Sequence, residues 1–241
     1  MNLKEHLAAE HKISPFTTYL REIVYGGNDG IVTTFAVVAG FTGAHATASI
    51  ASVPVISVLL FGLANLFADA TSMSLGSFLS LRAEKDVYRG EKAKELHEIL
   101  HEPKMELEET IEILTLKGYA LSDAQALAKL LAKNEQYWTE FMMHDELGLP
   151  NPEGENPFFV SLATFLSFAA FGFIPLVPYI AAPHAPAVFT YSVASTAFAL
   201  ILLGILRWYV SKIRIARSVL ETLAVGTISA SVAFFVGTFF R

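Results

Sequence analysis

Carboxylates recur at helical intervals in the middle of the chain. Glu91, Glu95, Glu98 and Glu102 are separated by four, three and four residues, which would stack them on one face of a helix. Like charges at this spacing repel one another and destabilise an isolated helix. A bound divalent cation would reverse that cost, because carboxylate oxygens are ligands for hard and borderline metals. The pattern indicates either a divalent-metal site or a solvated acidic face that nearby lysines partly neutralise.

Two later segments add further ligand types. Glu106 and Glu109 repeat the three-residue step, and Met142 and Met143 precede Glu146. Thioethers are soft ligands, which suit a transition metal better than Mg²⁺ or Ca²⁺. Two adjacent methionines are also typical of helix packing, so the metal and packing interpretations both stay open.

Ionisable side chains also occur in otherwise apolar segments. Asp29 lies at the predicted start of one such segment, and Asp69 is the only formally charged residue within 30–81. Asn65, Asp69 and Met73 follow one another at four-residue intervals and therefore share a helix face. An ionisable group at membrane depth is costly and marks an ion or proton path. Asp29 could instead cap a helix, and Met73 alone would be an ordinary core residue.

The composition is that of a membrane protein with an acidic insert. Of 241 residues, 53% are hydrophobic and 17% charged, with a mean hydropathy of +0.47. Residues 82–155 hold nine of the 17 Lys and Arg and 17 of the 23 Asp and Glu, a local charge of −8. The net charge of −6 argues against nucleic-acid partners, and the absence of cysteine excludes cysteine-ligated zinc, iron–sulfur clusters and a thiol nucleophile.

The apolar windows are long enough for five membrane spans. About 20 apolar residues cross the ~30 Å of hydrocarbon in a bilayer. We expect spans at about 28–48, 54–81, 157–181, 186–208 and 218–240. Spans 3 and 4 must be separate, because Pro183 and Pro186 cannot continue a helix.

The fold class we predict is an all-α membrane protein: five transmembrane helices with a three-helix cytosolic insert between spans 2 and 3. The insert helices are expected at 82–101, continuing span 2, at 103–118 beginning with a proline, and at 122–147. We predict four parts of the chain: an amphipathic N-terminal segment (1–21), spans 1–2 (22–81), the acidic metal-binding insert (82–155) and spans 3–5 (156–241).

Lysine and arginine placement predicts the orientation of the spans. They cluster before span 1, in the insert and at 207–217, whereas the loops near 49–53 and 181–186 have none. The positive-inside rule then puts the N-terminus and insert in the cytosol and the C-terminus outside or in a lumen.

Two common enzyme motifs are missing from the sequence. It has no Gly-x-Ser-x-Gly and no phosphate-binding loop, and we expect no enzyme activity. Glu98-x-x-His101 matches half of a di-iron carboxylate motif, but a second Glu-x-x-His is missing. A membrane-attached di-iron oxidase and a non-transporting metal sensor remain as alternatives.

Two motifs, taken in the order in which they occur along the chain, resemble those of the vacuolar iron transporter family. They are Gly26-Gly27-Asn28-Asp29-Gly30 at span 1, and Ser72-Met73-Ser74-Leu75-Gly76-Ser77-Phe78-Leu79-Ser80 closing span 2. The five-span layout with its acidic insert is also similar, and the likeness covers the chain from about Tyr19 onward.

The resemblance implies a homodimeric antiporter that exchanges Fe²⁺ for protons and accepts Mn²⁺. Because we place the insert in the cytosol, we expect the metal to move out of the cytosol. Co²⁺, Ni²⁺ and Zn²⁺ would also bind as substrate ions. No cofactor is implied. The partners are metal ions, protons, the lipid bilayer and a second copy of the chain. The membrane would be a bacterial inner membrane or an organelle membrane of vacuolar type.

The same resemblance assigns the candidate ligands. In the insert they are Glu95 and Glu98, Glu106 and Glu109, and Met142, Met143 and Glu146. In the membrane pathway they are Asp29 and Met73. To these we add Asp69, as a group that holds a proton or shapes the site. Asn65 departs from the family pattern, in which some members carry an acidic residue at this position. That departure bears on proton stoichiometry and metal preference.

Overall fold

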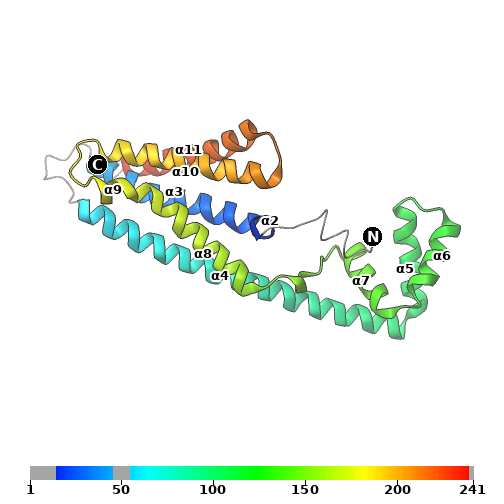
Figure 1. Ribbon diagram of the computed structural model, residues 1–241. Helices are drawn as coiled ribbons and strands as arrows, with labels where there is room; N and C mark the ends of the chain where they lie inside the picture. Colours follow the sequence, from blue (N-terminus) through cyan, green and yellow to red (C-terminus); the bar gives the residue numbers. More distant parts are fainter. Residues whose placement is uncertain (1–14, 46–54, 239–241) are drawn as a thin grey trace. The chain divides into compact units, whose positions relative to one another are not determined.

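A computed structural model describes residues 15–45 and 55–238 of the chain as helices joined by short connections (Figure 1). No strand occurs in these two ranges, which confirms the all-α prediction. Most of the N-terminal segment that we expected to be amphipathic lies outside them. Its described part is the short helix α2, Pro15–Thr18, and the start of the next helix.

The chain divides into two compact units. Residues 1–78 and 158–241 form one unit, here called the membrane unit, and residues 79–157 form the other, here called the insert. Helix α4, Val55–His101, is continuous over 47 residues and contributes to both units. The predicted continuation of span 2 into the acidic segment is therefore confirmed as one uninterrupted helix.

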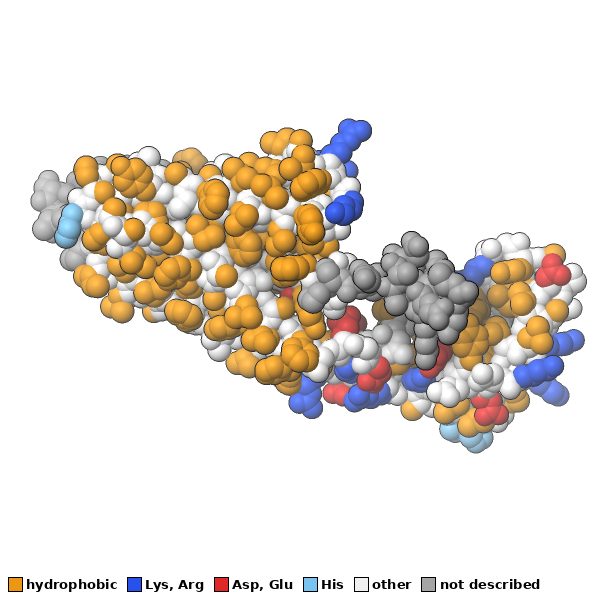
Figure 2. Space-filling view, viewed as in Figure 1, with side chains coloured by type: hydrophobic (Ala, Val, Ile, Leu, Met, Phe, Trp, Pro, Cys, Tyr) orange, Lys and Arg blue, Asp and Glu red, His pale blue; other side chains and the backbone are white. Residues whose placement is uncertain are grey.

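The membrane unit consists of long apolar helices. They are α3 (Leu20–His45), the first part of α4, α8 (Pro157–Phe173) with η2 (Ile174–Leu176) and α9 (Val177–Ala181), α10 (Val188–Ser211) and α11 (Ile215–Thr238). Hydrophobic side chains cover the visible surface of this unit (Figure 2). Among described residues, four stretches are long and apolar enough to cross a membrane: α4, 157–181, α10 and 215–232. Helix α3 is not among them, so the count of five spans stays a prediction.

Small residues let α3 and α8 approach closely. A Cβ on Gly30 would lie 2.4 Å from the carbonyl oxygen of Phe168, and one on Gly172 would lie 2.7 Å from the carbonyl oxygen of Gly30. Such contacts exclude any side chain, and membrane helices commonly pack through small residues in this way. Beside this crossing, Leu66 and Phe168 are fully buried in the unit's main hydrophobic cluster.

Helix α3 begins earlier than the sequence suggested. We expected span 1 to start near residue 28, but α3 begins at Leu20, so Asp29 lies in its third turn. The interpretation of Asp29 as a helix cap is therefore wrong. The sequence argument treated the adjacent glycines as a helix boundary. They lie inside the helix instead, because Gly26 packs where a Cβ would stand 2.9 Å from the carbonyl oxygen of Thr164.

The insert contains the end of α4 followed by α5 (Pro103–Leu116), α6 (Leu121–Leu131), α7 (Glu135–Asp145) and the 3-10 turn η1 (Pro152–Gly154). As predicted, Pro103 occupies the first turn of α5. The single helix expected over 122–147 is wrong, because it divides into α6 and α7. Helix α6 ends at Leu131, and Asn134 then caps the start of α7 by accepting a hydrogen bond from the Tyr137 backbone N–H.

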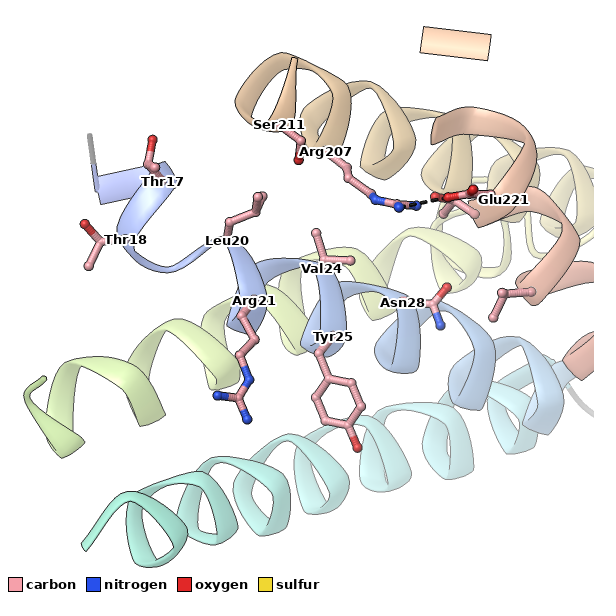
Figure 3. A pocket seen from close by; sticks show the side chains of 12 residues that line it. Thr17, Thr18, Leu20, Arg21, Val24, Tyr25, Asn28, Arg207, Ser211 and Glu221 are labelled. Atoms are coloured by element: carbon pink, nitrogen blue, oxygen red, sulfur yellow. Dashed lines mark ion pairs between the residues drawn. The ribbon is translucent and has the colours of Figure 1, made fainter. Parts of the chain in front are cut away.

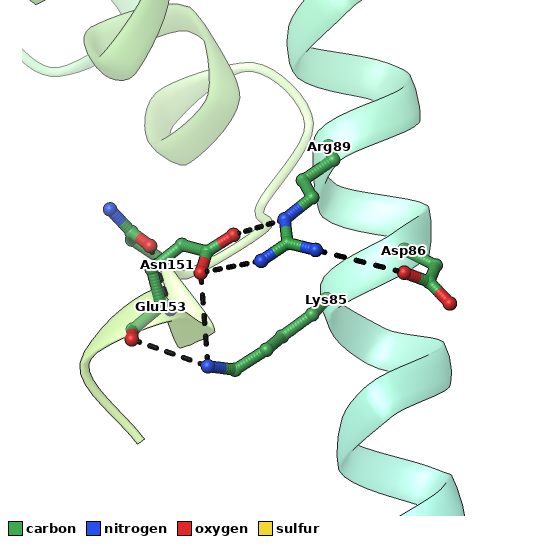
Figure 4. Close-up of polar contacts among 5 residues, drawn as sticks. All are labelled: Lys85, Asp86, Arg89, Asn151 and Glu153. Atoms are coloured by element: carbon green, nitrogen blue, oxygen red, sulfur yellow. Dashed lines mark hydrogen bonds and ion pairs between the residues drawn. The ribbon is translucent and has the colours of Figure 1, made fainter. Parts of the chain in front are cut away.

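An ion-pair network ties the returning segment of the insert to α4 (Figure 4). The guanidinium of Arg89 donates two hydrogen bonds to the Glu153 carboxylate, at 2.5 and 3.0 Å. Lys85 donates to the Glu153 carbonyl oxygen at 3.2 Å. Asn151 accepts a hydrogen bond from the Glu153 backbone N–H, which shapes the turn that presents this carboxylate. The network fixes the end of the insert to its own first helix.

Candidate metal sites

Three carboxylates converge inside the insert. Glu95 of α4, Glu106 of α5 and Glu146 just after α7 each offer an oxygen, and these atoms lie within 4.8 Å of one another. Glu95 and Glu106 are almost fully buried, at 3% and 1% exposure, whereas Glu146 is exposed. Residues from the end of α4, from α5 and from just after α7 thus build one site, in which only Glu146 is exposed.

Two oxygens in this cluster are buried without a hydrogen-bond partner. They are Glu95 Oε1 and Glu106 Oε2. A buried charged group without a partner costs several kcal/mol, so such groups are normally paired or coordinate a metal. Oxygen atoms at this separation suit the coordination of a divalent cation. The pair is therefore not a solvated acidic face, and with Glu146 its oxygens could hold a divalent cation.

Electrostatics keeps protons on the cluster when no cation is present. Burial, together with the neighbouring carboxylates of Glu106 and Glu146, raises the pKa of Glu95 to about 8. Burial also raises the pKa of Glu106 to about 7, although its hydrogen bond with Glu95 opposes that rise. At neutral pH the two carboxyl groups therefore share a proton. A metal ion needs the deprotonated form and must displace it.

The other two predicted glutamates act on the cluster through their charge. Burial raises the pKa of Glu146, and the carboxylates of Glu109 and Glu98 raise it further. Glu109 is half-buried and Glu98 is exposed. They do not belong to the group of three that lies within 4.8 Å. Their position near its exposed member concentrates negative charge where an ion would arrive.

Both methionines are fully buried beside this region. Met142 packs with Ile99 and Trp138 in a hydrophobic cluster, which is the packing role that the sequence left open. Its sulfur also lies 3.4 Å from the Thr110 hydroxyl oxygen. Met143 is likewise at 0% exposure.

Thr110 and Trp138 support the cluster, and sequence reasoning missed both. The Thr110 hydroxyl donates to the Glu106 carbonyl oxygen at 2.7 Å and accepts from Trp138 Nε1 at 2.8 Å. These bonds link α5 to α7 directly behind Glu106. A weak signal was present, because Thr110 follows Glu106 by one helical turn.

In the membrane unit the predicted polar residues form a looser group. Asn65 Nδ2 donates to Asp69 Oδ2 at 2.7 Å, as the four-residue spacing on α4 predicts. Asp29 on α3 is half-buried and close enough to Asp69 for their carboxylates to interact. Met73 is half-buried and packs against the main hydrophobic cluster. Among its described residues, this unit brings no three acidic or histidine side chains together as the insert does.

A cavity of about 870 Å³ opens beside these helices, between α3, α10 and α11 (Figure 3). Its wall includes Asn28, next to Asp29, but its charged groups are arginines and Glu221. Arg207 already pairs with Glu221 at 2.8 Å, and Arg217 pairs with the same carboxylate at 2.8 Å. A carboxylate held by two guanidinium groups does not offer a free ligand to a cation.

Comparison of the sequence with known proteins shows which family it is similar to. The profile of the VIT family matches residues 20–238. The chain is 35% identical to vacuolar iron transporter 1 of Arabidopsis thaliana, covering 96% of this chain and 90% of that protein. It is 33% identical to vacuolar iron transporter 1 of Eucalyptus grandis, over 96% and 91%. A vacuolar iron transporter of Toxoplasma gondii is 38% identical over 75% of this chain and 59% of its own length.

Proposed function

Because the chain belongs to the VIT family, we propose that it carries divalent transition-metal ions, Fe²⁺ first among them, across a membrane. The observation that carries the proposal is the buried carboxylate pair of the insert. Two of its oxygens have no partner and its protons are weakly acidic. The arrangement is that of a site which exchanges protons for a cation.

The insert collects the ion in this proposal. Glu146 is the accessible member of the cluster, and the charges of Glu98 and Glu109 attract a cation toward it. Glu95 and Glu106 then release their shared proton and bind the metal inside. Met142 and Met143 bring thioether sulfur to the same region, which favours a transition metal over Mg²⁺.

The membrane unit supplies the path. Asp29 and Met73 are the ligands we propose at membrane depth, with Asp69 holding a proton or shaping the site and Asn65 orienting Asp69. These groups are only half-buried in one copy of the chain, and Asp29 and Met73 from a second copy would complete a coordination sphere. A homodimer is therefore part of the proposal.

Proton coupling follows from ligand chemistry. A carboxylate that holds a proton cannot bind a metal, so protons and M²⁺ compete for the same groups. An inward proton gradient would then drive metal out of the cytosol, with the insert on the cytosolic side. Mn²⁺ would share the path, and Co²⁺, Ni²⁺ and Zn²⁺ would bind as well. The relatives named for vacuolar transport favour an organelle membrane of that type.

The oxidase alternative is less well supported by the geometry. A di-iron carboxylate site needs histidines beside its glutamates. Among described residues, the carboxylate cluster contains Glu95, Glu106 and Glu146 and no histidine. His101 of the half-motif is exposed and bonds to its own helix. Nothing in the cluster favours catalysis over ion binding.

Transport in proteoliposomes under an imposed pH gradient tests the proposal. Fe²⁺ should move against protons with the wild type. Asp29→Ala should reduce transport to background, and Glu106→Ala should slow it severalfold without stopping it. Asp123→Asn, which removes an exposed charge elsewhere in the insert, should transport like the wild type.

Two results would overturn the proposal. One is a wild-type protein that binds metal yet moves none under either gradient direction. The other is unchanged transport by a folded Asp29→Ala variant. A wild type that moves metal at the same rate with and without the pH gradient would remove the proton coupling alone.

A further inference from the structure

Two histidines on the outer side of α4 form a second pair of metal-ligand groups. His97 and His101 are four residues apart, both are exposed, and their rings stack with centroids 3.9 Å apart. Paired imidazoles at this helical spacing are a recurrent arrangement for binding zinc and similar ions. Exposed imidazole groups are visible on the surface of the insert (Figure 2).

The ring of His101 is oriented as metal-binding imidazoles are. Its Nδ1 lies 2.8 Å from the His97 backbone carbonyl oxygen. A carbonyl oxygen accepts only, so Nδ1 carries the proton and donates it. That leaves the Nε2 lone pair of His101 free to bind a cation. Histidine ligands in metalloproteins typically donate their other ring N–H to a carbonyl or carboxylate in this way.

The surroundings of the pair favour a cation. His101 is the last residue of α4, where the partial negative charge of the helix dipole lies. Lys94, one turn before His97, already pairs with Glu91 at 2.6 Å, so its positive charge is compensated. Glu98 and Glu102 flank the pair and are exposed. The local field therefore attracts positive charge.

This pair is separate from the carboxylate cluster. At about 100° per residue, His97 and His101 lie about 200° and 240° around the helix axis from Glu95. Glu95 is buried against α5, whereas both histidines face outward. An ion bound by the imidazoles would not be bound by the cluster. The two sites also differ in ligand type, since neutral nitrogen replaces carboxylate oxygen.

We propose that His97 and His101 form an auxiliary site on the insert for borderline divalent ions, namely Cu²⁺, Ni²⁺ and Zn²⁺, bound through the two imidazole nitrogens. Imidazole suits these ions, and affinity for them exceeds that for Mn²⁺ or Fe²⁺ in the usual order. His101 keeps its bond to the His97 carbonyl oxygen, and the exposed His97 ring turns a nitrogen toward the ion held at Nε2 of His101. Water completes the coordination. The site does not depend on whether the protein transports metal.

Electron paramagnetic resonance of Cu²⁺ added to the untagged full-length protein tests the proposal, because coupling to nitrogen separates imidazole from carboxylate ligands. The wild type should show a nitrogen-coupled Cu²⁺ at one equivalent. His97→Gln and His101→Gln should each weaken this binding by about tenfold or more, since one of two ligands is lost. Glu106→Gln should leave the nitrogen signal intact.

His144→Gln is the matched control, because His144 is exposed on α7 and carries the same group. It should not change the nitrogen signal. The proposal fails if both His97→Gln and His101→Gln retain wild-type nitrogen coupling and affinity. It also fails if His144→Gln removes the signal, or if wild-type Cu²⁺ is bound by oxygen alone.

Discussion

The insert and the membrane unit place acidic groups in opposite ways. In the insert, Glu95 and Glu106 are nearly inaccessible and two of their oxygens have no partner. In the membrane unit, Asp69 already has a hydrogen-bonding neighbour in Asn65, and Asp29 is half-buried. The insert thus holds one complete cluster within a single chain, whereas the membrane unit holds separate ligands. A site that captures an ion needs its ligands already assembled. Ligands along a transport path must instead bind the ion and then release it.

The supporting structure differs as well. The insert holds its site with polar side chains, through the chain of hydrogen bonds from Trp138 to Thr110 to the backbone of Glu106. The membrane unit places Asp29 by packing small residues, with Gly26 and Gly30 on either side of it pressed against α8. Removing a contact should therefore change mainly the metal affinity in the insert. In the membrane unit it should change mainly the packing of the helices.

Gly30→Ala should give the largest effect. The new methyl group would meet the Phe168 carbonyl oxygen at 2.4 Å, so α3 and α8 must move apart. Overpacking of this kind costs about 1–3 kcal/mol or more. The thermal midpoint in detergent should fall by several degrees, and transport should fall with it because Asp29 is displaced.

Gly40→Ala on the same helix is the control for this comparison. A Cβ there meets nothing within 4 Å, and alanine is the better helix former. The variant should be as stable as the wild type or slightly more stable. Equal losses from the two substitutions would contradict the packing account of Asp29 placement.

Glu106→Gln should abolish stabilisation of the protein by metal. Wild-type protein at a free metal concentration 100 times Kd gains about 2.7 kcal/mol. The glutamine variant should gain little and should be no less stable than wild type without metal, because it no longer buries a carboxylate. Thermal melts with and without Mn²⁺ measure both effects. Glu112→Gln, an exposed position on the same helix, should respond to metal like the wild type.

The stability of the metal-free insert should fall as pH rises. Burial raises the pKa of Glu95 from 4.5 to about 8, so the folded state holds a proton that the unfolded state has lost. Stability linked to this proton is fully present below pH 4.5 and is lost as pH rises through about 8. Melting of the full-length protein between pH 5 and 8.5 should show the decline. Divalent metal should reverse it at the alkaline end, and a flat metal-free profile would contradict the shared proton.

Glu153→Gln should have the smallest effect. The ion pair of Glu153 with Arg89 holds the pKa of that carboxyl below its usual range, yet both groups are exposed and screened by salt. Thermal stability and metal affinity should stay within experimental scatter of the wild type. A clear loss of metal affinity would mean that the network of Figure 4 positions the cluster, and the insert would then depend on its exposed surface as well.

Local patterns in the sequence determined much of the secondary structure of this protein. Charge-free windows longer than a bilayer requires predicted the apolar helices, and Pro103 predicted the break before α5, because both depend on neighbouring residues alone. The four-residue spacing of Asn65 and Asp69 likewise predicted their contact on one helix face. The resemblance also named Glu95, Glu106 and Glu146 together, although nothing in their spacing showed that they meet.

Only the tertiary structure decided the rest. Which glutamates are buried depends on how α5 folds back on α4 and on where the end of α7, about 40 residues further along the chain, meets them. We predicted one helix over 122–147 because the apolar pattern continues past Asn134. The Asn134 side chain instead caps the start of a separate helix, α7. Asp29 was placed at a helix end because glycine usually marks one. Gly26 and Gly30 are instead required inside α3, since their missing side chains make room for the backbone of α8.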